Sequence, residues 1–198
     1  MNLIISWRYL KLNRLVVIGA STGGPKHIEK ILKALPHDYP TAVVIAQHMD
    51  DQYIPSFIKR LDSVCALSVK ALQKDAAVEQ NCVYICSSIC KLEYKNGRVC
   101  GGGECQIYDY NPSINGFFDS VANLAKDIKV LSVILTGIGA DGASGMQKIV
   151  QNGGKAIVES PKTAIVYGMP LRAKELSPQA KECDLDAIID EVLEFGNV

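Results

Sequence analysis

The sequence predicts an α/β fold, with a doubly wound, mostly parallel sheet flanked by helices and with a small β-hairpin. Three nearly continuous apolar runs, rich in β-branched residues, occur at residues 15–18, 41–46 and 130–135. Such runs are typical of strands that are buried on both faces of a parallel sheet. Segments with apolar residues at helical spacing lie between these runs, and strands that alternate with helices form parallel sheets.

The first strand leads directly into a helix. The run at 15–18 is followed by a glycine-rich turn at 19–24 and by Pro25, a residue that the first turn of a helix accepts. Over residues 28–35 the apolar side chains then share one helical face. This order predicts a strand, a sharp turn and a helix.

The same criteria predict the remaining elements. We expect helices at 53–61, 113–126, 142–151, 169–176 and 185–195, and strands at 67–69, 82–86 and 155–158. Asn96-Gly97, between short strands at 92–94 and around Val99, predicts a type I′ hairpin turn. The glycines at 101–103 predict a loop.

The composition is ordinary for a globular protein. Of 198 residues, 48% are apolar, and 21 basic residues balance 21 acidic ones. A net charge of zero gives no reason to expect nucleic acid or an anionic membrane surface as a partner. No apolar run approaches the roughly 20 residues of a membrane span, and residues 1–12 lack a signal-peptide cleavage site. We therefore expect a cytoplasmic protein without membrane insertion.

The chain is expected to form one domain over residues 1–198. The residues that precede the first strand, 1–14, are too few for a domain and are expected to form a short N-terminal extension.

Seven cysteines, an odd and scattered number, argue against a full disulfide framework. Five of them lie between positions 82 and 105, but none has C-x-x-C spacing and no histidine lies near. We expect reduced cysteines that act as small hydrophobic side chains in strands, and neither a metal site nor a cofactor. The seven are Cys65, Cys82, Cys86, Cys90, Cys100, Cys105 and Cys183.

The turn after the first strand, Gly19-Ala20-Ser21-Thr22-Gly23, has the G-x-S-x-G pattern of a nucleophile elbow. Such an elbow exposes a serine hydroxyl where a developing oxyanion meets the free N–H groups of a helix N-terminus. Two alternatives remain. One is a phosphate-binding turn, although neither the Walker ending nor the three-glycine dinucleotide spacing is present. The other is a plain turn in which Ser21 caps the helix.

Three strands lead into Ser21, His48 and Asp141. Ligands of parallel sheets bind outside the carboxyl ends of the strands, so we expect these three residues to meet in one crevice. A serine hydroxyl needs a neighbouring base, histidine changes charge near neutral pH, and a carboxylate fixes the tautomer of the imidazole. The order Ser, His, Asp differs from the Ser, Asp/Glu, His order of α/β-hydrolases, which we do not expect here.

Each of these residues also has a purely structural alternative. His48 could be a hydrogen-bonded core histidine, and Asp141 could cap the helix after its glycine turn. His27, within the first helix, and His37, in a polar loop, are predicted to be surface residues.

Four segments resemble the catalytic domain of the CheB family, the bacterial chemoreceptor protein-glutamate methylesterases. They are GASTGGP at 19–25, QHM at 47–49, ILTGIGADGA at 134–143 and VYGMP at 166–170. They occur in the family's order and spacing, and the resemblance covers roughly residues 14–195.

The resemblance implies hydrolysis of glutamate γ-methyl esters on the cytoplasmic helices of methylated chemoreceptors, with release of methanol. Many members of the family also deamidate receptor glutamines. Ser21 would be the nucleophile, His48 the general base and then acid, and Asp141 the orienting carboxylate. The backbone N–H of Thr22, and a second from the glycine turn around Ile138, would face the oxyanion.

Two features depart from the family's pattern. Its usual members carry an N-terminal phosphorylatable receiver domain. We do not expect one here, because the extension 1–14 is too short. Cys86-Ser87-Ser88-Ile89-Cys90 replaces a Pro-Gly-Gly-containing turn, in a loop expected near the catalytic mouth. Two other functions stay open: a serine hydrolase for another ester or amide, and a binding module without catalytic activity.

Overall fold

The computed structural model describes residues 12–104 and 111–197. Most of the expected extension 1–14, and Cys105, therefore lie outside the described residues. Within them, seven strands form one sheet in which every neighbouring pair is parallel, and two more form an antiparallel hairpin. The predicted α/β fold with a small hairpin is confirmed.

The order of the strands places β1 in the middle of the sheet. Its neighbours are β2 on one side and β7 on the other, so the chain builds one half of the sheet first and then the other. Such a reversal of strand order is where open α/β sheets bind ligands. In spatial order the strands are β3 (Ser68–Ala71), β4 (Cys82–Ile85), β2 (Ala42–Gln47), β1 (Arg14–Ala20), β7 (Lys129–Ile134), β8 (Lys155–Glu159) and β9 (Lys181–Cys183).

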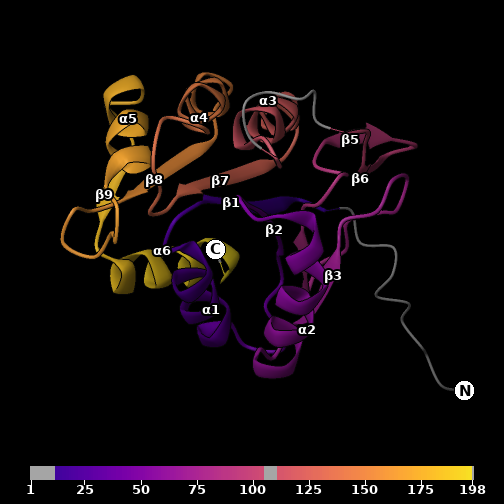
Figure 1. Cartoon of the computed structure of the whole chain (residues 1–198). Coiled ribbons are helices and arrows are strands. Elements are labelled where there is room, and N and C mark those ends of the chain that lie inside the picture. The colour runs from indigo at the N-terminus through magenta and orange to yellow at the C-terminus, as the bar shows by residue number, and fades with distance from the viewer. Residues whose placement is uncertain (1–11, 105–110, 198) are drawn as a thin grey trace, which may run out of the picture.

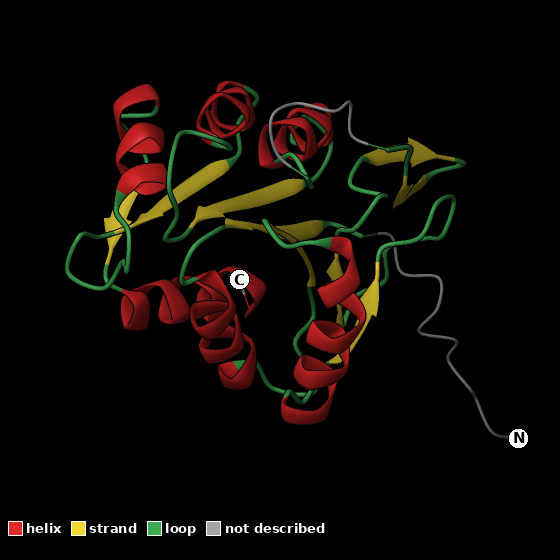
Figure 2. Cartoon of the chain, viewed as in Figure 1, coloured by secondary structure: helices red, strands yellow, loops and turns green. Residues whose placement is uncertain are grey.

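Helices cover both faces of the sheet, as Figures 1 and 2 show. One layer consists of α3 (Ile114–Leu124), α4 (Ala143–Gln151) and α5 (Gly168–Leu176). The other consists of α1 (Gly24–Ala34), α2 (Ile54–Val64) and α6 (Leu185–Asn197), with a 3-10 turn, Asp51–Tyr53, before α2. The hairpin of β5 (Leu92–Lys95) and β6 (Arg98–Gly101) lies beside α3.

The central strand β1 explains why the strand sequences are continuously apolar. Leu15 and Val17 pack in the hydrophobic cluster that contains the α3, α4 and α5 side chains. Val16 and Ile18 pack in the cluster that contains the α1, α2 and α6 side chains. All four residues have zero exposure, because a helix layer covers each face of the sheet.

Every predicted helix and strand occurs close to its expected position, and Asn96 (φ 52°) and Gly97 (φ 79°) form the expected turn with two positive φ angles. Strand β9 was not predicted. It is a three-residue edge strand with two exposed residues, so it carries no apolar run. Gly101, expected in a loop, ends β6, where a Cβ would overlap the backbone carbonyl of Gln73.

The cysteine prediction is correct in part. Cys82, Cys86 and Cys100 are buried and free, as expected of small hydrophobic side chains. The prediction is wrong for Cys90, which is disulfide-bonded. A disulfide requires only that two Cβ atoms meet in space, which spacing along the chain does not reveal.

None of the helices in the described part of the chain combines the length and the apolar character needed to cross a membrane.

The packing of the α3 layer against the sheet can be tested at Phe118. Phe118 has zero exposure and its ring approaches Gly19 of β1. We expect Phe118→Ala to lower the free energy of unfolding by about 3–5 kcal/mol, because the emptied space cannot close completely. Urea denaturation would measure this loss. Tyr53→Ala, at a position that is 58% exposed, is the control, with an expected change of about 0.5 kcal/mol or less. Equal losses would contradict the assigned core.

Candidate active site

Three adjacent strands, β2, β1 and β7, bring the predicted site residues to one edge of the sheet. The strand register pairs Ala20 with Gln47 and Gly19 with Ile134. Beyond the strands, the N–H of His48 donates to the Ala20 carbonyl at 2.9 Å, and the N–H of Ser21 donates to the Thr136 carbonyl at 3.0 Å. The chain segments therefore stay paired up to the point where Ser21 and His48 leave the sheet.

Ser21, His48 and Asp141 form a continuous hydrogen-bond chain. His48 Nδ1 lies 3.2 Å from Ser21 Oγ, and His48 Nε2 lies 2.7 Å from Asp141 Oδ2. A carboxylate only accepts hydrogen bonds, so the Asp141 contact assigns the ring proton to Nε2 and leaves the lone pair of Nδ1 for the serine hydroxyl. The sequence prediction that these three side chains meet is correct.

Asp141 is buried among hydrogen-bond donors from α3. Its carboxylate accepts the N–H groups of Ile114 and Asn115, each at 2.8 Å, and that of Gly142 at 3.0 Å. Burial by itself raises the pKa of Asp141, but the hydrogen bonds from His48 and from the Asn115 and Ile114 amides outweigh it. The pKa therefore lies below the ordinary value of a carboxyl group.

These contacts exclude the alternative in which Asp141 caps the helix that follows it. The N-cap of α4 is Gly142, and no side chain caps that helix. Asp141 instead satisfies the first N–H groups of α3, a helix that comes earlier in the chain, in addition to orienting His48.

The elbow geometry also excludes Ser21 as a helix cap. Helix α1 has Gly23 as its N-cap and no side-chain hydrogen bond there. Gly23 has φ +87°, and a Cβ on it would lie 2.7 Å from Ile165 Cγ1. Glycine is therefore required by the backbone conformation and by the close approach of the loop that carries Ile165.

In the described part of the chain, the backbone N–H groups of Thr22 and Ile138 have no hydrogen-bond acceptor. Thr22 directly follows the serine. Ile138 is 61% exposed and lies in the loop after β7, next to Gly137, where a Cβ would lie 2.8 Å from Ser21 Cβ. Both segments named by the sequence therefore border the serine, with N–H groups available to a ligand.

The other two histidines differ from each other. The side chain of His37 is 84% exposed, as predicted. The prediction that His27 is a surface residue is wrong: it is 8% exposed, and its Nδ1 lies 3.1 Å from Oε1 of the buried Glu159. His27 lies four residues before Ile31, on the buried face of α1, and this spacing was the available signal.

Three further buried polar residues surround the elbow and were not singled out from the sequence: Gln47, Thr136 and Glu159. Gln47 and Glu159 are the last residues of β2 and β8, and Thr136 follows β7 by two positions. A polar residue at the end of an apolar strand was the signal that could have identified them.

In the residues that the structure describes, no group of three or more His, Cys, Asp or Glu side chains is arranged to hold a metal ion. The loop of residues 86–90 follows β4, which neighbours β2. This loop therefore lies at the same edge of the sheet as Ser21.

The fold and the hydrogen-bond chain together define a class of protein. It is an α/β protein in which a serine, an imidazole and a carboxylate lie at one edge of the sheet, in the arrangement typical of serine hydrolases. Within this class, the model of the CheB methylesterase family matches residues 16–192, and the chain belongs to that family.

Similar proteins agree with this assignment. The chain is 33% identical to the Thermotoga maritima CheB methylesterase catalytic domain, whose crystal structure superposes with a TM-score of 0.84 over 91% of this chain and 97% of that one. Two relatives named protein-glutamate methylesterase/protein-glutamine glutaminase are 35% identical (Methanosarcina mazei, 93% of this chain and 52% of the relative) and 36% identical (Oleidesulfovibrio alaskensis, 90% and 49%). The chain thus spans about half the length of these relatives.

The lowered pKa of Asp141 predicts a pH-dependent stability. A carboxyl group whose pKa is lower in the folded state stabilises the protein fully above its unfolded pKa, about 3.9, and loses this contribution as the pH falls through the folded pKa. We expect Asp141→Asn to reduce the free energy of unfolding by about 1–3 kcal/mol at pH 7, and the deficit to shrink below about pH 4.

Urea denaturation of both proteins across this pH range would measure the deficit. Asp38→Asn, at a carboxylate whose side chain is 75% exposed, is the matched control and is expected to change the unfolding free energy by no more than about 0.5 kcal/mol. A deficit that grows as the pH falls would contradict the assignment.

Proposed function

We propose that the chain hydrolyses γ-methyl esters of glutamate side chains on the cytoplasmic domains of chemoreceptors, in chemotaxis adaptation. The observation that carries this proposal is the hydrogen-bond chain from Ser21 through His48 to Asp141, in a member of the CheB methylesterase family. The names of the relatives support glutamate methyl esters as substrates. A cytoplasmic substrate places the reaction in the cytoplasm, and no cofactor is needed for it.

The geometry of the site supports an acyl-transfer mechanism. Ser21 Oγ attacks the ester carbonyl carbon while His48 Nδ1 takes the hydroxyl proton, and Asp141 stabilises the imidazolium through Nε2–H. The negative charge that develops on the carbonyl oxygen is stabilised by the N–H groups of Thr22 and Ile138.

The second half of the reaction uses the same groups. The tetrahedral intermediate expels methanol, which takes its proton from His48, and leaves a glutamyl ester on Ser21 Oγ. Water then attacks this acyl-enzyme while His48 Nδ1 takes a proton from it. The bond between the carbonyl carbon and Ser21 Oγ breaks, His48 returns the proton to Oγ, and a glutamate side chain is released. With a glutamine substrate the leaving group is ammonia, and the acyl-enzyme is identical.

The proposal predicts that methanol release depends on Ser21. We expect the purified protein to release methanol from a methylated receptor cytoplasmic fragment, and Ser21→Ala to lower kcat by at least about 10³-fold, because nucleophilic catalysis is lost. Ser63→Ala, an exposed serine on α2, is the matched control and should retain full activity. Thermal denaturation monitored by circular dichroism would verify that both variants are folded.

Other outcomes identify the alternatives. If a small activated ester is cleaved at Ser21 but the receptor fragment is not, the chain is a serine hydrolase with another substrate. If Ser21→Ala leaves every measured activity unchanged, the chain is a binding module and the proposal is wrong.

Deamidation supplies a second prediction. A receptor fragment with glutamine at the modified positions is expected to release ammonia, and Ser21→Ala should abolish this release to the same degree as methanol release, since one acyl-enzyme serves both reactions. Ammonia release that persists in Ser21→Ala would assign deamidation to a different group.

A further inference from the structure

Both peptide groups that flank Thr22 are held by buried polar side chains. On the first side, Gln47 Nε2 donates to the Ser21 carbonyl and to the His48 carbonyl, each at 2.9 Å, and Gln47 is 3% exposed. One amide group thus connects the backbone of the serine to the backbone of the histidine. A Cβ at Gly24 would overlap Gln47 Oε1, so the side chain fills the space under the elbow.

The Gln47 contact determines a direction as well as a position. In a trans peptide the C=O of one residue and the N–H of the next point to opposite sides of the same plane. The plane that contains the Ser21 carbonyl also contains the N–H of Thr22, which has no acceptor in the described part of the chain. The Ser21 carbonyl also accepts the N–H of Gly24 at 2.9 Å, so Gln47 and this turn hydrogen bond together fix where the N–H of Thr22 points.

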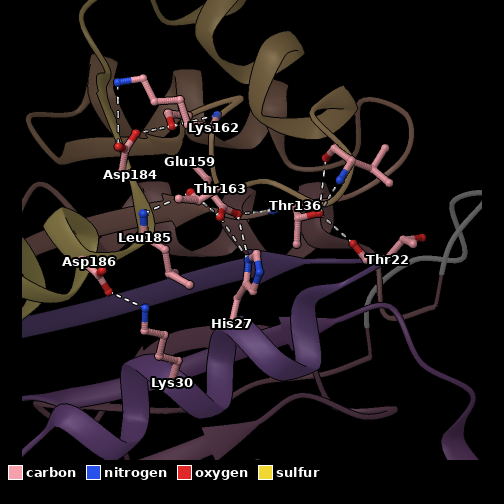
Figure 3. A network of polar contacts seen from close by, with 12 residues as sticks. Thr22, His27, Lys30, Thr136, Glu159, Lys162, Thr163, Asp184, Leu185 and Asp186 are labelled. Carbon is pink, nitrogen blue, oxygen red and sulfur yellow. Dashed lines mark hydrogen bonds and ion pairs between the residues drawn. The ribbon is translucent and has the colours of Figure 1, made fainter.

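Thr136 holds the next peptide group. Its hydroxyl donates to the Thr22 carbonyl at 2.8 Å and accepts from the N–H of Val166 at 2.8 Å, as Figure 3 shows for the contact with Thr22. The side chain therefore joins the elbow to the loop that carries Ile165, the loop that approaches Gly23. Thr136 has zero exposure, so water does not replace these contacts.

Glu159 in turn holds Thr136. Its carboxylate has zero exposure and accepts the N–H of Thr136 at 2.9 Å and the hydroxyl of Thr163 at 2.8 Å (Figure 3). His27 Nδ1 lies 3.1 and 3.2 Å from its two oxygens. A buried carboxylate requires such donors, because its desolvation is otherwise uncompensated.

The two lysines labelled in Figure 3 form ion pairs with carboxylates other than Glu159. Lys30 pairs with Asp186, and Lys162 lies 4.0 Å from Asp184. Thr136, Thr163 and His27 are therefore the partners that orient the Glu159 carboxylate.

We propose that Gln47 and Thr136 are positioning residues: they hold the peptide groups on either side of Thr22 and thereby aim its N–H at the oxyanion, with Glu159 keeping Thr136 in place. This inference rests on the function proposed above. The N–H of Thr22 acts on charge that exists only in the transition state, so loss of its orientation lowers kcat and leaves KM nearly unchanged.

The test uses pairs of variants with similar shape. Gln47→Met keeps the length of the side chain and removes the donor, and Thr136→Val keeps the shape and removes the hydroxyl. We expect each to lower kcat for methanol release by about 10²-fold, the cost of a small misplacement at a reacting centre, with KM changed by no more than about threefold.

Conservative variants separate positioning from simple loss of stability. Thr136→Ser loses the buried methyl group but keeps the hydroxyl, and it is expected to retain most of kcat even where its melting temperature falls. Glu159→Gln keeps an acceptor for the N–H of Thr136 and should also retain most of kcat, whereas Glu159→Met, without an acceptor, should lower kcat by about tenfold or more.

All variants would be assayed well below their melting temperatures. If Thr136→Val and Thr136→Ser have equal kcat, or if Gln47→Met keeps the wild-type kcat, the proposal is wrong. If KM rises and kcat does not fall, these residues bind substrate and do not position the oxyanion donor. Should Thr136→Val fail to fold, the Gln47 and Glu159 variants decide.

A second measurement separates this proposal from the substrate assignment. A fluorophosphonate reacts with a nucleophilic serine: the Oγ–P bond forms, fluoride leaves with the hydroxyl proton, and the phosphoryl oxygen occupies the oxyanion position. The labelling rate, followed by intact mass, should fall in Gln47→Met and Thr136→Val by the same factor as kcat.

If the wild-type protein is labelled at Ser21 but releases no methanol, the proposed substrate is wrong and the labelling rates still test the positioning residues. If the wild-type protein is neither labelled nor active, both proposals are overturned.

Discussion

The buried carboxylate of Asp141 is the interaction on which the site depends. A single side chain accepts hydrogen bonds from the imidazole of His48, from two N–H groups at the start of α3 and from Gly142. The cost of burying this charge is offset by four donors, which come from three separate parts of the chain. The ring of His48 is thus oriented by a group that is itself fixed by the position of a helix. The chemistry at the sheet edge and the packing of the α3 layer are therefore not independent.

Much of this arrangement could be predicted from the sequence, for identifiable reasons. The apolar runs identify the central strands because each is covered on both faces, and the carboxyl ends of parallel strands share one edge. The sequence places Ser21, His48 and Asp141 at this edge because each follows one of these runs. The hairpin was found because Asn96-Gly97 tolerates the positive φ angles that the turn needs.

The parts that were missed depend on contacts between distant segments. Strand β9 exists because an edge is available for it beside β8, and its own residues carry no apolar signal. The spacing of His27 and Ile31 indicates that His27 is buried, but its partner, Glu159, lies on a strand far along the chain and is not indicated by any local pattern. The two hydrogen bonds that the start of α3 donates to Asp141 also join distant segments, and no local pattern predicts which helix end a carboxylate will meet. Cys90 was assigned as reduced because spacing does not reveal which side chains meet.

The parallel sheet also has a consequence for how the protein assembles. No two strands of the seven-stranded sheet are joined by a tight turn, and His48 and Asp141 are 93 positions apart in the chain. A contact between residues so far apart in the sequence requires the closure of a long loop. Because the entropy of loop closure is lost before the contact stabilises the fold, such contacts favour slow folding. A partly folded intermediate with only the first half of the sheet would hold Ser21 and His48 but not the carboxylate that orients the ring. The arrangement of serine, imidazole and carboxylate is therefore complete only when β7, the strand that precedes Asp141, has paired with β1.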